Sequence, residues 1–150
     1  MDTSGEPLVH ALEEGVFLAK PNQAELHYLT GKSPTTIDET MKAGMEVLHK
    51  FPCEALLISM GAGGAMLLRR DFYLHACAPA TKRLSTCGAG DSMVAGATFM
   101  LERGKSWADV LHFGIACGTA ATMNPGTHLF RKEDVYNLLK QMEEKHAAQP

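Results

Sequence analysis

Residues 85–93, STCGAGDSM, place two glycines around an alanine, follow them with a carboxylate and lead into an apolar stretch. Glycines allow the backbone to approach a ligand closely, and the N–H groups at the start of a helix point outward. Such a loop can hold an anion, and Asp91 beside it could accept a proton from a hydroxyl group. An isolated loop of this kind could equally be a glycine turn with an acidic residue in the first turn of a helix. The rest of the sequence has to decide between these two interpretations.

The composition is that of an ordinary globular protein, with 45% hydrophobic and 21% charged residues in a chain of 150. This length suits one domain with a sizeable core. The net charge of -3 gives no broad basic surface for nucleic acid or for an anionic membrane, and no apolar run is long enough to span a bilayer. The first ten residues, MDTSGEPLVH, lack the basic and apolar regions of a signal peptide. We therefore expect a cytoplasmic protein that binds neither nucleic acid nor membrane.

The four cysteines are scattered along the chain, and no two of them have CxxC spacing. No histidine stands in a zinc-finger pattern with them. We therefore expect reduced thiols, as in a cytosolic protein.

Hydrophobic periodicity predicts alternating helices and strands. Helices are expected over residues 6–14, 23–30, 36–50, 91–103, 107–123 and 132–145, and strands over residues 16–19, 54–59, 65–68 and 72–76. This alternation is typical of an α/β layered fold with a largely parallel sheet flanked by helices.

In such sheets, ligands bind at the carboxyl ends of the strands. Three loops that contain glycine or asparagine are expected at such ends, over residues 20–25, 59–64 and 85–91. Asn22 and Glu25 also have the spacing of a helix capping box. Neither a P-loop nor a dinucleotide-binding GxGxxG motif is complete anywhere in the chain.

The segment STCGAGDSMVAGA resembles the C-terminal signature of the ribokinase-like, or PfkB, carbohydrate kinases. The segments DTSGEPL, AKPNQAEL, ISMGAGGAMLL and FGIACGTAATMNPGT also resemble this family and follow its order. Within the family, the sequence looks most like the minor-type 6-phosphofructokinases, the 1-phosphofructokinases and the tagatose-6-phosphate kinases. The resemblance extends over the whole chain and corresponds to the C-terminal half of such kinases.

The resemblance implies ATP-dependent transfer of a phosphoryl group to a hydroxyl of a sugar phosphate, with fructose 6-phosphate as the first candidate. Asp91 would be the base that deprotonates the hydroxyl, and the backbone N–H groups of Gly88, Ala89 and Gly90 would form the anion hole. Positioning and charge stabilisation carry the rate of such a reaction.

Nucleotide and cation contacts are implied by the same resemblance. ATP contacts fall on Lys20, Asn22, Ser59, Gly61, Gly64 and Thr119. Asn22 and Glu25 match the NxxE motif that organises Mg²⁺, partly through water, in keeping with the reluctant dehydration of this ion. A K⁺ site built mainly from backbone carbonyls would use Ser85, Cys87, Ala121, Asn124, Gly126 and His128.

Each of these assignments has a structural alternative. Asn22 and Glu25 could be a plain capping box, and Ser59 could mark a strand-to-turn corner. The small residues around Thr119 could serve close packing between helices. The sequence also departs from its relatives, with Ala24 where lysine is common and His128 where arginine is common.

The family's N-terminal half supplies most sugar-phosphate contacts, the lid strands and much of the dimer interface. We therefore expect residues 1–150 to be a single C-terminal nucleotide-binding and catalytic portion of a longer, dimeric sugar kinase, and to be inactive alone. The alternatives are a noncatalytic nucleotide-binding module and a degenerate kinase fragment that assembles only with partners. The intact GAGD loop with Asp91 favours the kinase.

Overall fold

Strands β1 (Val16–Ala19) and β2 (Cys53–Ser59) form the parallel part of a four-stranded sheet in the computed structural model. The structure describes residues 2–126, 128 and 130–147. Helix α1 (Gly5–Glu14) precedes β1, and helices α2 (Gln23–Thr30) and α3 (Ile37–Lys50) connect β1 to β2. Such a crossover is what a parallel pair of strands requires.

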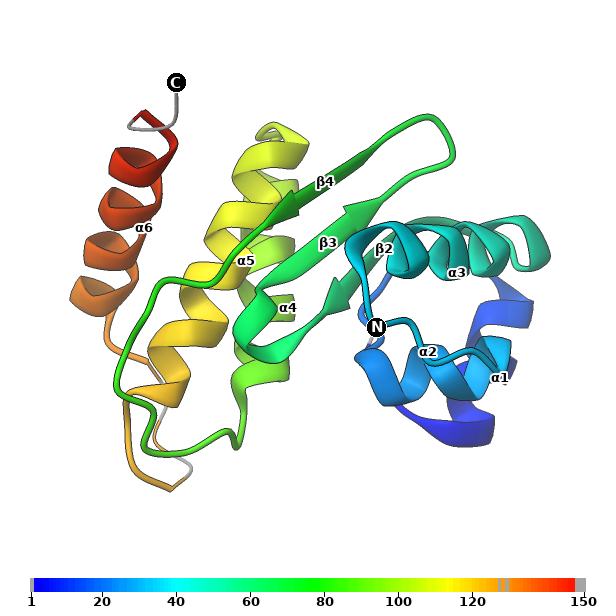
Figure 1. Cartoon of the computed structure of the whole chain (residues 1–150), viewed down its shortest axis with the longest axis horizontal. Coiled ribbons are helices and arrows are strands. Elements are labelled where there is room, and N and C mark those ends of the chain that lie inside the picture. Colours follow the sequence, from blue (N-terminus) through cyan, green and yellow to red (C-terminus); the bar gives the residue numbers. More distant parts are fainter. Residues whose placement is uncertain (1, 127, 129, 148–150) are drawn as a thin grey trace. The chain divides into compact units, whose positions relative to one another are not determined.

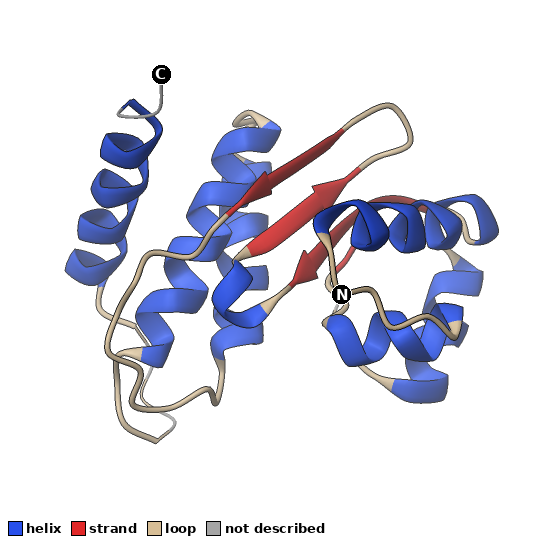
Figure 2. Cartoon of the chain, in the orientation of Figure 1, coloured by secondary structure: helices blue, strands red, loops and turns tan. Residues whose placement is uncertain are grey.

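The sheet is mixed, so the prediction of a largely parallel sheet is wrong. Strand β2 is followed by a short 3₁₀ turn, η1 (Gly61–Gly63), and then by β3 (Ala65–Leu68), which runs antiparallel to it. The strand order is β1-β2-β3-β4, with β4 (Tyr73–Ala76) at the far edge (Figure 2). The connection between β2 and β3 is far shorter than the roughly dozen residues that a parallel crossover needs, so the chain has to reverse direction.

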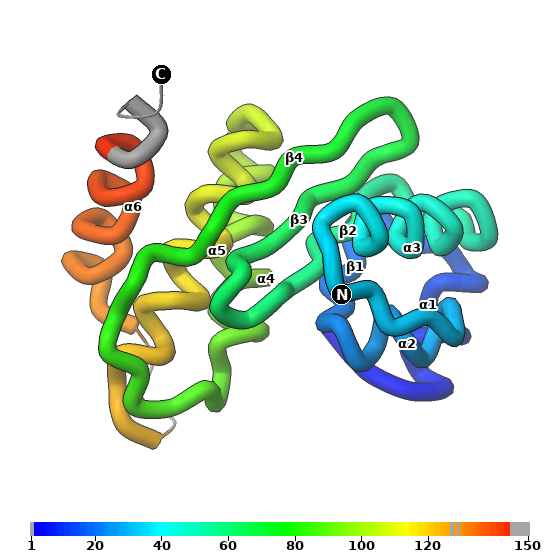
Figure 3. The backbone as a smooth tube through the Cα atoms, in the orientation of Figure 1, coloured from blue at the N-terminus to red at the C-terminus, as the bar shows by residue number. Residues whose placement is uncertain are grey.

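The chain divides into two compact units, Met1–His75 and Ala76–Pro150. In the first unit, α1, α2 and α3 gather beside β1 and β2 (Figure 3). Apolar side chains from these helices and strands form one buried cluster, which includes Leu8, Leu12, Leu26, Val47, Leu48, Leu56, Ile58, Met66 and Leu68. Burial of these side chains is the main force that holds the sheet against its helices.

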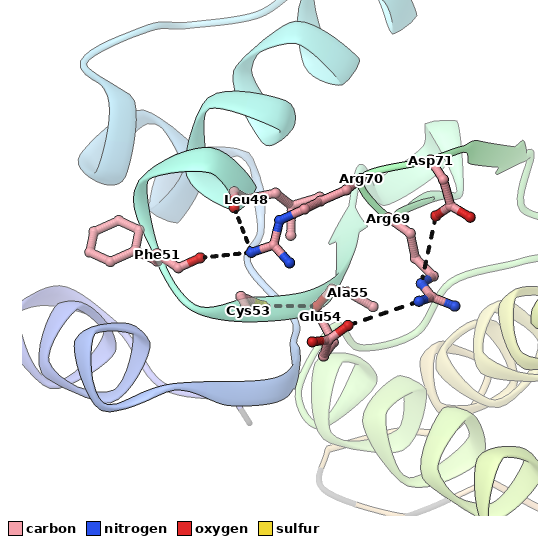
Figure 4. Close-up of polar contacts among 8 residues, drawn as sticks. All are labelled: Leu48, Phe51, Cys53, Glu54, Ala55, Arg69, Arg70 and Asp71. Atoms are coloured by element: carbon pink, nitrogen blue, oxygen red, sulfur yellow. Dashed lines mark hydrogen bonds and ion pairs between the residues drawn. The ribbon is translucent and has the colours of Figure 1, made fainter.

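Arg70 ties the C-terminal end of α3 to the end of β3. Its Nη2 atom donates to the carbonyl oxygens of Leu48 at 3.0 Å and Phe51 at 3.5 Å (Figure 4). The last carbonyls of a helix have no partner within the helix, and a guanidinium group there also favours the negative end of the helix dipole. Arg69, its neighbour, lies 3.9 Å from each of two carboxylates in the same view.

The second unit consists of α4 (Ala89–Glu102), α5 (Trp107–Thr122) and α6 (Lys132–Ala147), with α5 packed against both of the others (Figure 1). Glycines bring α4 and α5 close together. A Cβ atom on Gly96 would lie 2.7 Å from Sγ of Cys117. Val135 of α6 is buried in a small apolar cluster with residues of α5.

The helices and strands expected from the sequence are present, with ends shifted by a residue or two. Helix α4 begins at Ala89 rather than at Asp91, because Gly88, with φ of 74°, serves as its N-cap. Across the described part of the chain, no helix combines the length and the apolar character needed to cross a membrane.

Candidate functional site

The carboxyl ends of β1 and β2 bring two of the three predicted loops together. An isolated parallel bridge joins Asn22 to Ser59, and the N–H of Ser59 donates to the carbonyl oxygen of Pro21 at 3.0 Å. Residues 20–25 and 59–64 therefore lie side by side, because neighbouring parallel strands end at the same edge of a sheet.

Asn22 and Glu25 form the expected capping box at the start of α2. The Oδ1 atom of Asn22 accepts the N–H of Glu25 at 2.9 Å, and the Oε2 atom of Glu25 accepts the N–H of Asn22 at 2.8 Å. These bonds leave the second carboxylate oxygen of Glu25 and the amide group of Asn22 for other contacts. A carboxylate oxygen is a ligand that Mg²⁺ favours, so the two residues fit both roles.

Lys20 follows the last residue of β1 and is only 4% exposed. Its Nζ atom lies 3.3 Å from Oδ1 of Asp2, whose side chain is 23% exposed. Asp2 is not among the site residues expected from the sequence. The one signal in the sequence for a role of Asp2 was its place in a segment that resembles the PfkB kinases. No sequence pattern pairs Asp2, which precedes α1, with Lys20, which follows it.

The turn after β2 presents backbone rather than side chains. Gly61 has φ of 57° and Gly64 has φ of 85°, a region that glycine occupies without strain. The N–H of Met60 donates to the carbonyl oxygen of Gly64 at 2.9 Å and closes the turn. A Cβ atom on Gly61 would meet no atom within 4 Å, so this corner is open to a ligand that approaches the backbone.

In the second unit, α4 starts without a side-chain cap. Helices α2, α3 and α5 each begin with a capping box, whereas the N-cap of α4 is Gly88. The N–H groups of Ala89, Gly90 and Asp91 belong to the first turn and have no acceptors within the helix. The N–H of Ala89 makes a long contact, 3.4 Å, with the carbonyl oxygen of Thr86. This helix start is therefore suited to hold an anion.

Asp91 is exposed in that first turn. Within the described part of the chain, no hydrogen bond or ion pair is found at its carboxylate. An exposed carboxylate that no protein group engages can accept the proton of a hydroxyl group, which is the task of a general base.

The loop before α4 lies beside the C-terminal end of α5. The N–H groups of Leu84 and Ser85 donate to the carbonyl oxygen of Thr122 at 2.7 and 3.2 Å. Ser85 and Ala121, two of the six residues proposed for the K⁺ site, therefore come close together. Cys87 is exposed, and its N–H donates to Oγ of Ser85 at 3.1 Å.

The remaining residues of the proposed K⁺ site follow α5. The side-chain amide of Asn124 donates to the carbonyl oxygen of Ala120 at 3.2 Å, and the backbone N–H of His128 donates to the carbonyl oxygen of Pro125 at 3.4 Å. Between them, Gly126 has φ of 62°. Among the described residues, no three His, Cys, Asp or Glu side chains form a metal-binding group. Backbone carbonyl oxygens are among the ligands that this region could offer a cation.

Thr119 is buried, 7% exposed, in the middle of α5. A Cβ atom on the preceding Gly118 would lie 3.0 Å from the carbonyl oxygen of Ala89, in the first turn of α4. The small residues of this run therefore serve close helix packing, and the contact of Thr119 with a nucleotide stays a prediction.

Comparison with known proteins decides the family. Residues 1–134 match the family described as pfkB family carbohydrate kinase. The chain belongs to the PfkB family. Among PfkB proteins, it is 37% identical over 139 residues to the ATP-dependent 6-phosphofructokinase isozyme 2 of Escherichia coli (strain K12), which covers 92% of this chain and 45% of that protein. It is 34% identical over 143 residues to the 1-phosphofructokinase of Borreliella burgdorferi, which covers 95% of this chain and 46% of that protein.

The fold of the chain is similar to that of a solved phosphofructokinase. The crystal structure of phosphofructokinase-2 from Escherichia coli in complex with potassium matches with a TM-score of 0.88 and 36% identity, over 95% of this chain and 46% of that one. The chain therefore has an α/β, ribokinase-like fold and spans less than half the length of these relatives.

Proposed function

We propose that this PfkB chain carries the nucleotide site and the catalytic base of an ATP-dependent sugar-phosphate kinase, with fructose 6-phosphate as the acceptor. The observation that carries the proposal is the start of α4, where Gly88 leaves the first-turn N–H groups without a side-chain cap and Asp91 stands exposed beside them. A relative named as a 6-phosphofructokinase supports fructose 6-phosphate as the acceptor.

In this proposal, Asp91 accepts the proton of the acceptor hydroxyl as the new phosphorus–oxygen bond forms. The N–H groups of Gly88, Ala89 and Gly90 stabilise the negative charge on the transferring phosphoryl group. General base catalysis of this kind contributes a factor of about 10² to 10⁴. The rest of the rate comes from positioning.

The first unit would hold the nucleotide through the buried ammonium of Lys20 and the open corner at Ser59, Gly61 and Gly64. Asn22 and Glu25 would hold Mg²⁺, partly through water, and this ion supplies charge neutralisation on the phosphates when it is bound.

In the second unit, Thr119 would contact the nucleotide. The carbonyls of Ser85, Cys87, Ala121, Asn124, Gly126 and His128 would hold K⁺. A potassium complex of a relative supports this cation.

Residues 1–150 act in this proposal as the nucleotide-binding and catalytic portion, and a sugar-binding portion such as the longer relatives contain would complete the enzyme as a dimer. The alternative is a noncatalytic nucleotide-binding module, which would not need an exposed carboxylate at the start of α4. The presence of Asp91 there favours the kinase.

The proposal is tested by calorimetric titration of Mg²⁺-ATP into the 150-residue chain, with and without K⁺. We expect saturable binding that requires Mg²⁺ and that strengthens with K⁺, and ATP with a chelator serves as the control. Absence of binding by a chain whose circular dichroism and thermal melting show it to be folded would contradict a nucleotide site in these residues.

A further inference from the structure

The ion pair between the buried Lys20 and the partly exposed Asp2 has no role yet in the proposed function. Lys20 is 4% exposed, and its Nζ atom lies 3.3 Å from Oδ1 of Asp2. Removing an ammonium group from water is unfavourable unless a partner compensates its charge. The Asp2 carboxylate is the anionic partner of this ammonium in the described part of the chain.

We propose that Asp2 is a positioning residue, which holds the ammonium of Lys20 at the carboxyl end of β1 in the orientation that meets a nucleotide phosphate. The inference rests on the proposed function, because it takes Lys20 as a nucleotide contact.

The backbone of Lys20 is fixed on both sides. Ala19 pairs with Leu56 of β2, and Asn22 is bridged to Ser59, so the segment that carries Lys20 is anchored to the sheet. The flexible four-carbon stem of a lysine is not fixed by these contacts, and holding it in one conformation costs rotamer entropy. The Asp2 carboxylate selects one conformation before any ligand binds.

The charged groups around Lys20 allow it to contact Asp2 and a phosphate at the same time. An ammonium group has three N–H donors, so a bond to Asp2 leaves donors for phosphate oxygens. Glu25, the nearest acidic residue along the chain after β1, directs its Oε2 atom to the backbone of Asn22 and so serves the start of α2. Asp2 therefore acts on Lys20 while Glu25 stays with the helix and the proposed Mg²⁺ site.

The first experiment measures the acylation of Lys20 by acetic anhydride in the native, nucleotide-free chain, read by mass spectrometry. We expect Asp2→Asn to raise the acylation rate of Lys20 by at least about fivefold, because the unpaired amine leaves its buried position. Asp38→Asn is the matched control, since it removes a carboxylate 2.7 Å from Lys42 on the exposed face of α3. An unchanged Lys20 rate in folded Asp2→Asn would overturn the proposal.

The second experiment measures Mg²⁺-ATP affinity by calorimetry in Asp2→Asn, Asp2→Glu, Lys20→Met and the Asp2→Asn/Lys20→Met double variant. We expect about tenfold weaker binding for Asp2→Asn, with recovery to within about threefold in Asp2→Glu, because the charge is restored. The double variant should bind as Lys20→Met does, because coupled residues are not additive. A carboxylate that merely stabilised the fold would lower the affinity of the double variant further, and that result would overturn the proposal.

The double variant also keeps the test valid if Asp2→Asn alone does not fold, because it leaves no uncompensated buried charge. The two experiments separate the two hypotheses. If the wild-type chain does not bind Mg²⁺-ATP, the proposed function fails, whereas the acylation rates still decide whether Asp2 holds Lys20.

Discussion

Asp91 and Glu25 are both first-turn carboxylates, but their surroundings give them different chemistry. Glu25 closes a capping box with Asn22. Its Oε2 atom accepts the N–H of Asn22 at 2.8 Å, which fixes the carboxylate, and its own N–H donates to Oδ1 of Asn22 at 2.9 Å. Asp91 follows a glycine N-cap and is exposed, with no such bond in the described residues. A fixed carboxylate suits a cation, and an unengaged one suits proton transfer.

Replacement of Asp91 by asparagine should abolish phosphoryl transfer. The test is a chimera in which this chain replaces the matching segment of the Escherichia coli relative. We expect a loss of at least about 10²-fold in kcat with fructose 6-phosphate, because asparagine cannot accept the proton. The Kd for Mg²⁺-ATP should change less than about twofold, since the helix start keeps its N–H groups. Glu102→Gln, at the other end of α4, is the control, and wild-type turnover in the Asp91 variant would show that the base is misassigned.

Glu25→Gln should separate the cation role from the capping role. Glutamine still offers an oxygen to the N–H of Asn22, so the free energy of unfolding should change by less than about 0.5 kcal/mol. The Mg²⁺ concentration needed for half-maximal ATP binding should rise by about tenfold, because a neutral amide is a poorer ligand. Asn22→Ala, which removes the cap, should cost about 1 kcal/mol in thermal melting. An unchanged Mg²⁺ titration in Glu25→Gln would remove this residue from the site.

At the scale of the elements, the start of α4 is held by its packing on α5. Gly118 allows α5 to approach the carbonyl oxygen of Ala89 so closely that an added Cβ atom would lie 3.0 Å from it. Gly96 plays the same part from the α4 side, against Cys117. The proposed anion hole at the start of α4 therefore depends on the packing of Gly118, which lies in the next helix, α5.

Gly118→Ala should destabilise the chain by about 1–3 kcal/mol, because the added methyl group overpacks the contact between the two helices. Displacement of the first turn of α4 should also weaken Mg²⁺-ATP binding. Thr98→Ala, on the exposed face of α4, should stay within about 0.5 kcal/mol. Urea unfolding and calorimetry measure both effects. If Gly118→Ala were as stable as Thr98→Ala, the close contact would have no energetic role.

At the scale of the whole molecule, each compact unit contains one buried cysteine. Cys53 lies in the first unit and Cys117 in the second, whereas Cys77 and Cys87 are exposed. Burial raises the pKa of the Cys53 thiol, and it raises the pKa of Cys117 from 9.0 to about 12. Both folded units therefore favour the neutral thiol over the thiolate.

The free energy of unfolding should therefore fall at alkaline pH. Above pH 9.0 the unfolded chain releases the Cys117 proton, while the folded chain keeps it until its pKa of about 12. The unfolded state then binds fewer protons, so stability falls by up to about 1.4 kcal/mol per pH unit for this thiol. Urea unfolding in steps of about one pH unit from pH 8 to 11 measures the slope of the unfolding free energy against pH. Cys117→Ala should make this slope smaller. Equal slopes in the two proteins would mean that this thiol is not buried in solution.

The sequence by itself determined the helices and strands, the capping box of Asn22 with Glu25 and, through its resemblance to known motifs, the family. The helices, strands and cap follow from local causes, namely hydrophobic periodicity and the spacing of Asn22 and Glu25. The prediction of a largely parallel sheet was wrong, because β3 runs antiparallel to β2. The short turn at residues 60–64 is a local feature of the sequence that indicates this reversal of direction.

Only the tertiary structure decided which distant residues meet. The bridge from Asn22 to Ser59, the ion pair of Asp2 with Lys20 and the contact of Gly118 with Ala89 all join segments far apart in the chain. No periodicity encodes such pairs. They arise because strands β1 and β2 end at one edge of the sheet, because a buried ammonium needs a carboxylate, and because two helices approach closely where one of them carries a glycine.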